Sequence, residues 1–176
     1  GADFYFTQKR GTLSATWFNI DFRDLVASTS NFRSVENIQR ARTRGAELSA
    51  KFEFTSATTL RASYTYLEAD NLTTRARLLR RPRQSGSVDA WHDFGRGLST
   101  GAGVTFAAHR RDVDAKTFRQ IDAEDYTVVR VYGAWQINPR LALKARVENL
   151  LNKRYEEVNG YPALGFGAFA GAEWRF

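Results

Sequence analysis

Apolar and polar residues alternate with a period of two along most of the chain. Between Ala46 and Phe54 every even-numbered residue is apolar and every odd-numbered residue is polar or charged. Successive side chains of a β-strand point to opposite faces, so this pattern predicts strands with one apolar and one polar face. Clear or weaker forms of the alternation mark nine segments: 3–7, 12–22, 46–54, 60–66, 84–91, 98–106, 129–137, 141–147 and 168–176.

The second of these segments contains an irregularity. Trp17 and Phe18 are adjacent, large and apolar, and they interrupt the alternation. An extra residue in one strand of an antiparallel pair produces such an interruption, so we predict a β-bulge or a shift of phase at this point.

The connections between the predicted strands alternate in length. Short ones lie at 8–11, 56–58, 94–97 and 138–140, and long polar ones lie at 27–39, 69–81, 110–124 and 152–164. This order predicts an up-and-down meander with all long loops on one side. Each strand holds roughly the 9 to 11 residues that a tilted strand needs to cross a bilayer. The predicted fold class is therefore all-β, a transmembrane antiparallel up-and-down β-barrel with short periplasmic turns and long extracellular loops.

A soluble β-sandwich or lipocalin-like barrel also has alternating strands. Two features count against it: the polar face carries ionisable residues, and the apolar face mixes small residues such as Ala168, Ala170 and Ala172 with large ones. A soluble core of such small residues would pack poorly, whereas lipid tolerates them. Charged residues make up 26% of the chain and no run approaches the roughly 20 apolar residues of a membrane helix, which excludes a helical membrane protein.

Nine antiparallel strands cannot close with every neighbouring pair antiparallel, and bacterial single-chain barrels have even strand numbers. Either the segment 3–7 is not a strand and eight strands close, or the chain is eight to nine strands of a larger barrel. The chain contains no Met, even at position 1, so we expect a signal peptide or a longer N-terminal part upstream of Gly1. It also contains no Cys, which excludes disulfides and Cys metal sites.

Four stretches resemble TonB-dependent outer-membrane receptors. They are GADFYF at the start, RTRGAELSAKFEF at 42–54, LLRRPRQSG at 78–86 and VENLLNKRYEEVNGYPALGFGAFAGAEWRF at 147–176, and they occur in the family's order. The family's barrel has about 22 strands and a plugged lumen. The resemblance implies that residues 1–176 are a single C-terminal segment of such a barrel in a bacterial outer membrane, and that the plug domain and TonB box have no counterpart here.

The resemblance also implies a function: receptor-mediated uptake of a scarce chelate, powered by TonB through the missing plug. The stretch YEEVNGYPALG at 155–165 is most similar to cobalamin-type receptors, so the chelate is expected to be a corrinoid, or otherwise a ferric siderophore. Contacts with this small ligand would come from the long loops, with Arg80, Tyr155, Asn159 and Tyr161 as candidates. Two alternatives stay open: a small stand-alone outer-membrane barrel with a structural or passive pore role, and a soluble basic binding protein.

The C-terminus ends on an aromatic residue in the middle of an alternating pattern. In the family, and in outer-membrane barrels generally, such an end resembles the signal that the barrel-assembly machinery reads. A last strand with an unpaired edge can add to another sheet by β-augmentation. The predicted signal residues are Ala170, Ala172, Trp174 and Phe176; Phe176 would also suit the aromatic girdle at the periplasmic rim.

Three arginines continue the apolar face of 46–54 beyond its N-terminal end: Arg40, Arg42 and Arg44. A lipid-facing Arg costs roughly 2 to 4 kcal/mol at the bilayer midplane and close to nothing at the interface. They are therefore predicted at the rim, either solvated or bound to lipopolysaccharide phosphates. This placement accounts for part of the net charge of +7. Because the remaining excess is spread over loops and no basic helix or aromatic RNA platform is present, we expect no nucleic-acid partner.

Charged residues also fill the polar face, five acidic and six basic, and are expected to face a plug, water or one another: Glu47, Lys51, Glu53, Arg61, Asp89, Arg130, Lys144, Arg146, Glu148, Glu173 and Arg175. Catalysis has little support, because His92 and His109 are the only histidines and no zinc spacing, nucleophile elbow or phosphate loop occurs. His109 with Asp112 and Asp114 could imitate the Asp/His site of an outer-membrane protease. We expect no enzyme, no metal site and no cofactor.

Overall fold

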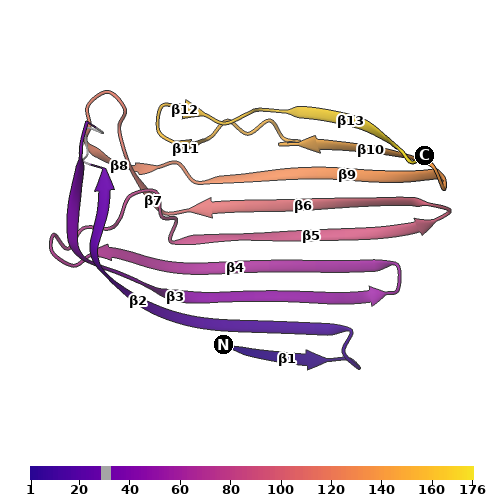
Figure 1. The fold of residues 1–176 in the computed structure, drawn as a ribbon, viewed down its shortest axis with the longest axis horizontal. Helices are drawn as coiled ribbons and strands as arrows, with labels where there is room; N and C mark the ends of the chain where they lie inside the picture. Colours follow the sequence, from indigo (N-terminus) through magenta and orange to yellow (C-terminus); the bar gives the residue numbers. More distant parts are fainter. Residues whose placement is uncertain (29–32) are drawn as a thin grey trace.

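The computed structural model describes residues 1–28 and 33–176, and nine of its strands form one antiparallel sheet (Figure 1). Neighbours in the sheet follow the order β1-β2-β3-β4-β5-β6-β9-β10-β13. The strands are β1 Ala2–Phe6, β2 Gly11–Ser28, β3 Val35–Thr55, β4 Thr58–Asn71, β5 Gln84–Gly95, β6 Leu98–Ala108, β9 Tyr126–Asn138, β10 Leu141–Glu148 and β13 Gly167–Trp174. All nine predicted strands are confirmed, as is the up-and-down connectivity.

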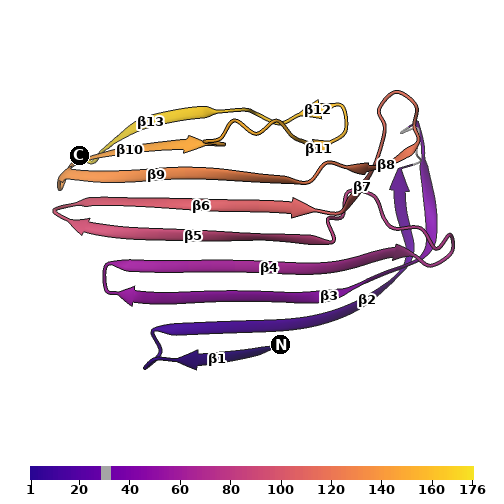
Figure 2. The same ribbon diagram turned by 180° about the vertical axis from the view of Figure 1, so that it is seen from behind.

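Four shorter strands form two hairpins inside the predicted long loops. They are β7 Arg110–Val113 with β8 Gln120–Ala123, and β11 Glu156–Val158 with β12 Tyr161–Pro162. Both hairpins lie at the end of the sheet opposite the short turns, as the views from the front and from behind show (Figures 1 and 2). We call this the loop end and the other the turn end. The alternation of the sequence did not predict these hairpins because their strands hold only two to four residues.

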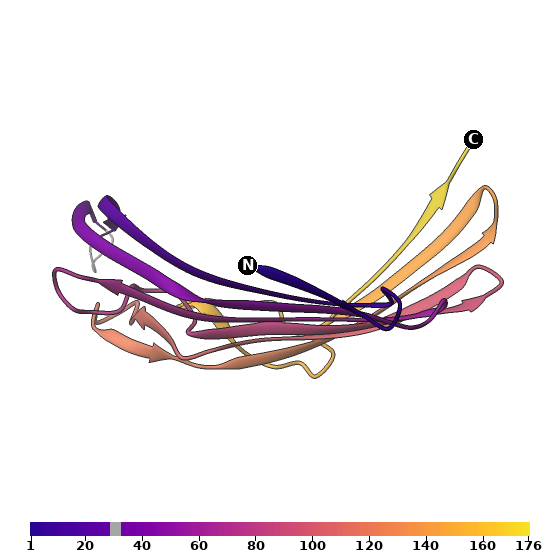
Figure 3. The ribbon, with the colours of Figure 1, turned by 90° about the horizontal axis from the view of Figure 1, so that it is seen from below.

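The sheet is open. In the described part of the chain, β1 pairs with β2 alone and β13 with β10 alone. Figure 3 shows a strongly twisted and curved sheet, in which β13 and the loop-end parts of β2 and β3 rise to the same side. Because β1 is a paired strand and the described strands do not close, the alternative of eight closing strands is wrong. The other alternative, eight to nine strands of a larger barrel, is confirmed.

Of the two explanations predicted for the irregularity at Trp17 and Phe18, the bulge is wrong and the shift of phase is what the structure has. The register of β2 against β3 runs unbroken from Gly11 opposite Phe52 to Arg23 opposite Arg40, so no bulge is present at this point. Instead the polarity of the two faces exchanges here. Towards the turn end the face of Trp17 is apolar, whereas towards the loop end it carries charged residues and the apolar side chains lie on the other face. A strand that continues beyond the hydrocarbon no longer needs an apolar outer face.

The strands β2 and β3 are also longer than predicted. They contain 18 and 21 residues, and their pairing extends to Ser28 opposite Val35. The predicted loop 27–39 is therefore mostly strand, and the prediction of its length is wrong. At about 3.3 Å per residue, these strands exceed a tilted crossing of the bilayer and project beyond it.

Large apolar side chains on one face of the sheet remain exposed. Trp17 is 70% exposed, Val88 49% and Trp135 49%, whereas the buried apolar residues among those described are four alanines and Val113. Monomeric soluble proteins rarely expose apolar surface on this scale, so this apolar face is suited to lipid. None of the described residues lies in a helix long and apolar enough to cross a membrane.

Aromatic rings gather on this apolar face at the turn end. Phe6 stacks on Phe52 with ring centroids 5.7 Å apart, and Phe52 meets Phe54 edge to face at 4.5 Å. Such rings are typical of the girdle at a membrane interface. The turns at this end are tight: a Cβ on Gly97, where φ is +79°, would lie 2.3 Å from the backbone oxygen of Gln136.

Candidate functional site

Three loops meet at the buried carboxylate of Asp112 in β7, whose exposed fraction is 0%. Its Oδ1 accepts a hydrogen bond from Arg80 Nε at 2.9 Å and one from its neighbour Val113 N at 2.8 Å. Its Oδ2 accepts one from Asn159 N at 2.7 Å. Arg80 belongs to the β4–β5 loop (72–83), Asp112 to the β7–β8 hairpin (110–123) and Asn159 to the β10–β13 loop (149–166). The carboxylate therefore joins segments that are distant in sequence.

Further contacts hold the β7–β8 hairpin against the β10–β13 loop. Asn159 Oδ1 accepts from Ala115 N at 2.9 Å, and Asn159 Nδ2 donates to Glu156 Oε2 at 3.1 Å. Arg110 Nη2 donates to the backbone oxygen of Glu156 at 2.6 Å. Because these bonds add to the Asp112 contact, the hairpin and the loop form one packed unit.

Burial alone would raise the pKa of Asp112. The hydrogen bonds from Asn159 N, the Arg80 side chain and Val113 N outweigh it and hold the pKa of the carboxyl below its ordinary value. Asp112 is therefore ionised at neutral pH, and its negative charge is matched by the guanidinium of Arg80.

A cavity of about 610 Å³ lies between the β7–β8 hairpin and the β10–β13 loop. The carboxylates at its wall are already engaged: Asp122 with Arg111 at 3.2 Å, Glu124 with Lys153, and Glu156 with Asn159 and Gly160 N. Its lining is Ile121, Asp122, Ala123, Glu124, Asn152, Arg154, Tyr155, Glu156, Asn159, Pro162, Ala163 and Gly165.

Arg154 is the cavity residue with an unused charge. It is exposed and, among the described residues, has no ion-pair or hydrogen-bond partner for its guanidinium. Next to it, Tyr155 packs on Tyr126 with ring centroids 4.2 Å apart. Burial, with lesser effects from Glu157 and Glu148, raises the pKa of Tyr155, so its hydroxyl stays protonated and can donate. The cavity thus offers the guanidinium of Arg154, with its N–H donors, to an anionic oxygen.

The four predicted ligand residues lie at different places. Tyr155 and Asn159 line the cavity, whereas Arg80 reaches Asp112 and joins a neighbouring loop to it. Tyr161 is 73% exposed and does not line the cavity. The structure therefore brings Arg80 and Asn159 to the same carboxylate, and a ligand role for all four stays a prediction. Sequence reasoning missed Arg154 and the joining role of Asp112, because no local pattern distinguishes either from other polar loop residues.

The structure gives no support to a protease-like pairing at His109. In the described chain, the carboxylate of Asp112 is bound by Arg80 and two backbone groups, and that of Asp114 by Thr117 and Lys116 N. Hydrogen bonds, chiefly from Thr117 N, lower the pKa of Asp114. Among the described residues, neither carboxylate forms a hydrogen bond or ion pair with the imidazole of His109. Among the described residues, no group of three or more His, Asp and Glu side chains could hold a metal ion.

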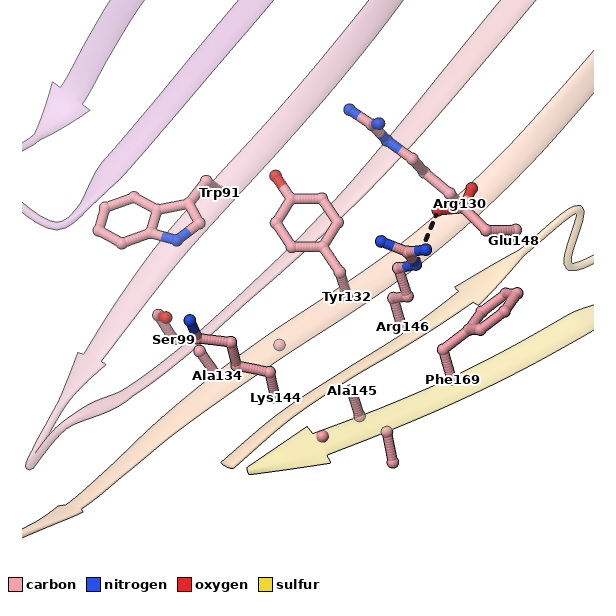
Figure 4. Close-up of a pocket in the computed structure, with 13 residues that line it drawn as sticks. Trp91, Ser99, Arg130, Tyr132, Ala134, Lys144, Ala145, Arg146, Glu148 and Phe169 are labelled. Atoms are coloured by element: carbon pink, nitrogen blue, oxygen red, sulfur yellow. Dashed lines mark ion pairs between the residues drawn. The ribbon is translucent and has the colours of Figure 1, made fainter. Parts of the chain in front are cut away.

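The polar face carries paired charges, as predicted. Lys144 Nζ lies 2.7 Å from Glu173, and Arg146 Nε lies 3.6 Å from Glu148 at the edge of a cavity of about 630 Å³ (Figure 4). Arg130 and Tyr132 of β9 extend away from β10 towards the strand that carries Trp91. A row of hydroxyls crosses five strands on this face: Ser14, Ser49, Ser63, Ser87 and Thr105.

The three predicted rim arginines share the face of Trp17, at the loop end. Arg42 Nε binds Asp21 Oδ1 at 2.6 Å and Arg44 Nε binds Glu68 Oε2 at 2.7 Å. Arg40 lies directly opposite Arg23, a pair of like charges, and neither guanidinium has an ion-pair partner among the described residues. Like charges opposite each other destabilise a sheet, so this pair leaves a place for an anion.

The predicted assembly residues lie on the unpaired edge strand. Ala170, Ala172 and Trp174 of β13 stand opposite Ala145, Leu143 and Leu141 of β10, on the apolar face. Phe176 follows at the turn end and is fully exposed. β13 is thus an edge strand with an aromatic residue after it. That the barrel-assembly machinery recognises this strand stays a prediction.

Together, the alternating faces, the exposed apolar surface and the long-loop end define the wall of an outer-membrane β-barrel. The sequence model of the family described as "TonB dependent receptor-like, beta-barrel" matches residues 1–150. The chain therefore belongs to the TonB-dependent receptor β-barrel family, whose members are outer-membrane transport receptors of Gram-negative bacteria, and its location is the outer membrane.

Solved structures of receptors share the fold. The ferric-catecholate import receptor Fiu of E. coli matches with a TM-score of 0.78 and 20% identity, over 99% of this chain and 26% of that one. The copper transporter OprC matches with a TM-score of 0.78 and 19% identity, over 97% and 30%. The ferripyoverdine receptor of Pseudomonas aeruginosa matches with a TM-score of 0.77 and 16% identity, over 97% and 25%. This chain thus spans about a quarter to a third of the length of these receptors.

Proposed function

We propose that this chain forms part of the wall and outer loops of a receptor for TonB-dependent uptake of an anionic metal chelate. The favoured chelate is a ferric siderophore. The observation that carries the proposal is the loop-end cavity with Arg154, whose guanidinium has no ion-pair partner in the described part of the chain. The engaged carboxylates leave Arg154 as the charge available to a ligand. A guanidinium binds planar anionic oxygens in a bidentate manner, and catecholate and carboxylate chelates present such oxygens.

Membership of the family supports the same class of substrate. A ferric-catecholate receptor and a ferripyoverdine receptor are among the structures that share the fold. The corrinoid expected from the stretch 155–165 stays a prediction. Energy would come from TonB acting on a plug domain of the full-length receptor.

Two further partners are proposed from the sheet itself. Lipopolysaccharide phosphates would bind at the loop-end rim, where Arg40 lies opposite Arg23 and neither forms an ion pair with the described residues. The barrel-assembly machinery would pair with the unpaired edge of β13, because an edge strand presents backbone groups for β-augmentation.

The test uses the full-length receptor in detergent and measures quenching of tryptophan fluorescence. The probes are a ferric tris-catecholate, a ferric hydroxamate and cyanocobalamin. We expect the ferric tris-catecholate to bind, and Arg154→Gln to weaken its binding about tenfold, since charged hydrogen bonds contribute roughly 1.5 to 3 kcal/mol. The control is Arg140→Gln, an exposed arginine at the turn end, which should leave binding unchanged.

Three results would contradict the proposal. Binding of cyanocobalamin alone would establish the corrinoid alternative, and equal effects of the two substitutions would exclude a role of Arg154. Steady ohmic pores in planar bilayers, formed by the purified chain without a plug, would favour a passive small barrel over a receptor segment.

A further inference from the structure

We infer that Asp112 is the positioning residue of the loop-end cavity: its buried carboxylate fixes the wall formed by Asn159 and Glu156 and joins it to the β4–β5 loop. The inference deepens the proposed function, since it concerns the same cavity. Asp112 itself does not line the cavity, and its effect on a ligand passes through Asn159.

The two oxygens of Asp112 have separate partners. Oδ1 accepts from Arg80 Nε at 2.9 Å and Val113 N at 2.8 Å, and Oδ2 accepts from Asn159 N at 2.7 Å. Removing one partner of a buried ion pair strongly destabilises the folded protein, because the remaining charge stays buried without compensation. Separation of the β10–β13 loop would leave Oδ2 without its donor, and separation of the β4–β5 loop would take the guanidinium of Arg80 away from a fully buried charge, so the three loops are held in place together.

Asn159 carries this constraint to the cavity. Its backbone N–H is held by Asp112, and its side chain bridges Ala115 N, at 2.9 Å, and Glu156 Oε2, at 3.1 Å. Asn159 and Glu156 both line the cavity. A ligand that displaces this wall must therefore strain the Asp112 contacts, and the strain reaches Arg80 in a loop that lies outside the cavity.

The variant Asp112→Asn isolates this role because it preserves the size of the side chain. An amide keeps one accepting oxygen and places an NH₂ group where the other oxygen stood. The NH₂ group cannot accept a hydrogen bond from an N–H, so the variant loses either the Asn159 contact or the contacts with Arg80 and Val113. In both cases a buried donor is left unsatisfied.

The first experiment is hydrogen exchange of the full-length receptor in detergent, without ligand. We expect Asp112→Asn to accelerate exchange about tenfold in residues 156–163 and in residues 78–81, since local opening follows the loss of local contacts. The matched control is Asp114→Asn, the same chemical change two residues along, in a carboxylate that binds only its own turn. This variant should accelerate exchange in residues 115–117 alone. Unchanged exchange in both distant segments, or faster exchange confined to 110–123, would overturn the inference.

A second experiment separates positioning from general stability. Uptake of the ferric tris-catecholate should show a KM about tenfold higher in Asp112→Asn with an unchanged maximal rate, because the plug and energy coupling are untouched. Asn159→Ala keeps the backbone N–H that Asp112 binds but removes the side-chain bridge. Asn159→Ala should raise KM about as much as Asp112→Asn does, without faster exchange in residues 78–81. An unchanged KM together with faster exchange in residues 78–81 would refute transmission through Asn159. If the wild-type receptor binds no ferric chelate, the proposed function fails while the exchange result still decides the role of Asp112.

Discussion

Arg130 of β9 donates to Asp89 of β5 across the intervening strand β6, with Nη2 and Oδ2 3.0 Å apart. The residue between them in the cross-strand row is Gly103. A Cβ at Gly103 would lie 2.7 Å from Asp89 Oδ2 and 2.9 Å from Arg130 Nε. In the neighbouring row Gly101 leaves room for Tyr132, whose hydroxyl donates to the same carboxylate at 2.7 Å. Two glycines of β6 on the polar face thus let one carboxylate of β5 bind two residues of β9.

The first prediction concerns this bridge. Gly103→Val should destabilise the folded receptor by about 1 to 3 kcal/mol, because the branched side chain displaces both ends of the bridge and must shift the groups around it. The measurement is the midpoint of urea unfolding in lipid vesicles, followed by tryptophan fluorescence. The matched control is Gly171→Val on β13, where a Cβ meets nothing within 4 Å. Equal shifts for the two variants would show that strand propensity, and not the bridge, determines the effect.

The second prediction concerns the loop-end rim. Replacing Arg40, Arg42 and Arg44 with Ala should weaken the retention of lipopolysaccharide in native mass spectra, since the anion loses its guanidinium donors. The double variant Arg23→Gln with Arg40→Gln should account for most of this loss, because Arg42 and Arg44 already bind carboxylates. Retention equal to wild type in the triple variant would contradict the proposed partner.

The third prediction concerns the C-terminal edge. Deletion of Phe176 together with Trp174→Ala should lower the amount of folded receptor in the outer membrane several-fold, because both the exposed aromatic end and the girdle contact are lost. The amount is measured from the heat-modifiable band of outer-membrane fractions. The control is Leu164→Ala, which changes an exposed residue of the β10–β13 loop. A normal folded amount after the double change would argue against a role of this end in assembly.

The fourth prediction concerns acidity at the loops. The folded pKa of Asp112 lies below its unfolded value, so its ionised form adds stability at pH values above the unfolded pKa. This contribution is lost as the pH falls through the folded pKa. The guanidinium of Arg80 faces Asp112, and Glu156 lies beyond Asn159.

Wild-type protection of residues 156–163 should therefore fall on acidification, after correction for the intrinsic pH dependence of hydrogen exchange. Asp112→Asn should show low protection that is independent of pH over the same interval. A parallel decline in both proteins would assign the acid response to another group.

Much of the fold could be predicted from local pattern. The period-two alternation located all nine strands of the sheet and the four tight turns, because the pleat of a strand imposes that period on any sheet with two unlike faces. Charge placement was also predictable: Lys144, Glu173, Arg146 and Glu148 share the polar face and pair there. The order of family-like stretches from 1 to 176 was sufficient to suggest the family, which the match to residues 1–150 confirms.

The tertiary structure alone decided the rest. Whether the sheet closes depends on the neighbours of β1 and β13, and no periodicity specifies them. The interruption at Trp17 and Phe18 left a bulge and a shift of phase open, because one sequence cannot distinguish an inserted residue from an exchange of faces. The unbroken register excludes the bulge.

The role of Asp112 depends on partners 32 and 47 residues away, at Arg80 and Asn159. A local pattern shows an acidic residue in a polar loop, and only folding removes it from water and supplies its donors. The sequence by itself determined the strands and their two faces, since these follow from near neighbours. The three-dimensional arrangement of the loops decided which polar residues form a site, because burial and hydrogen bonding there arise between segments that the chain brings together only on folding.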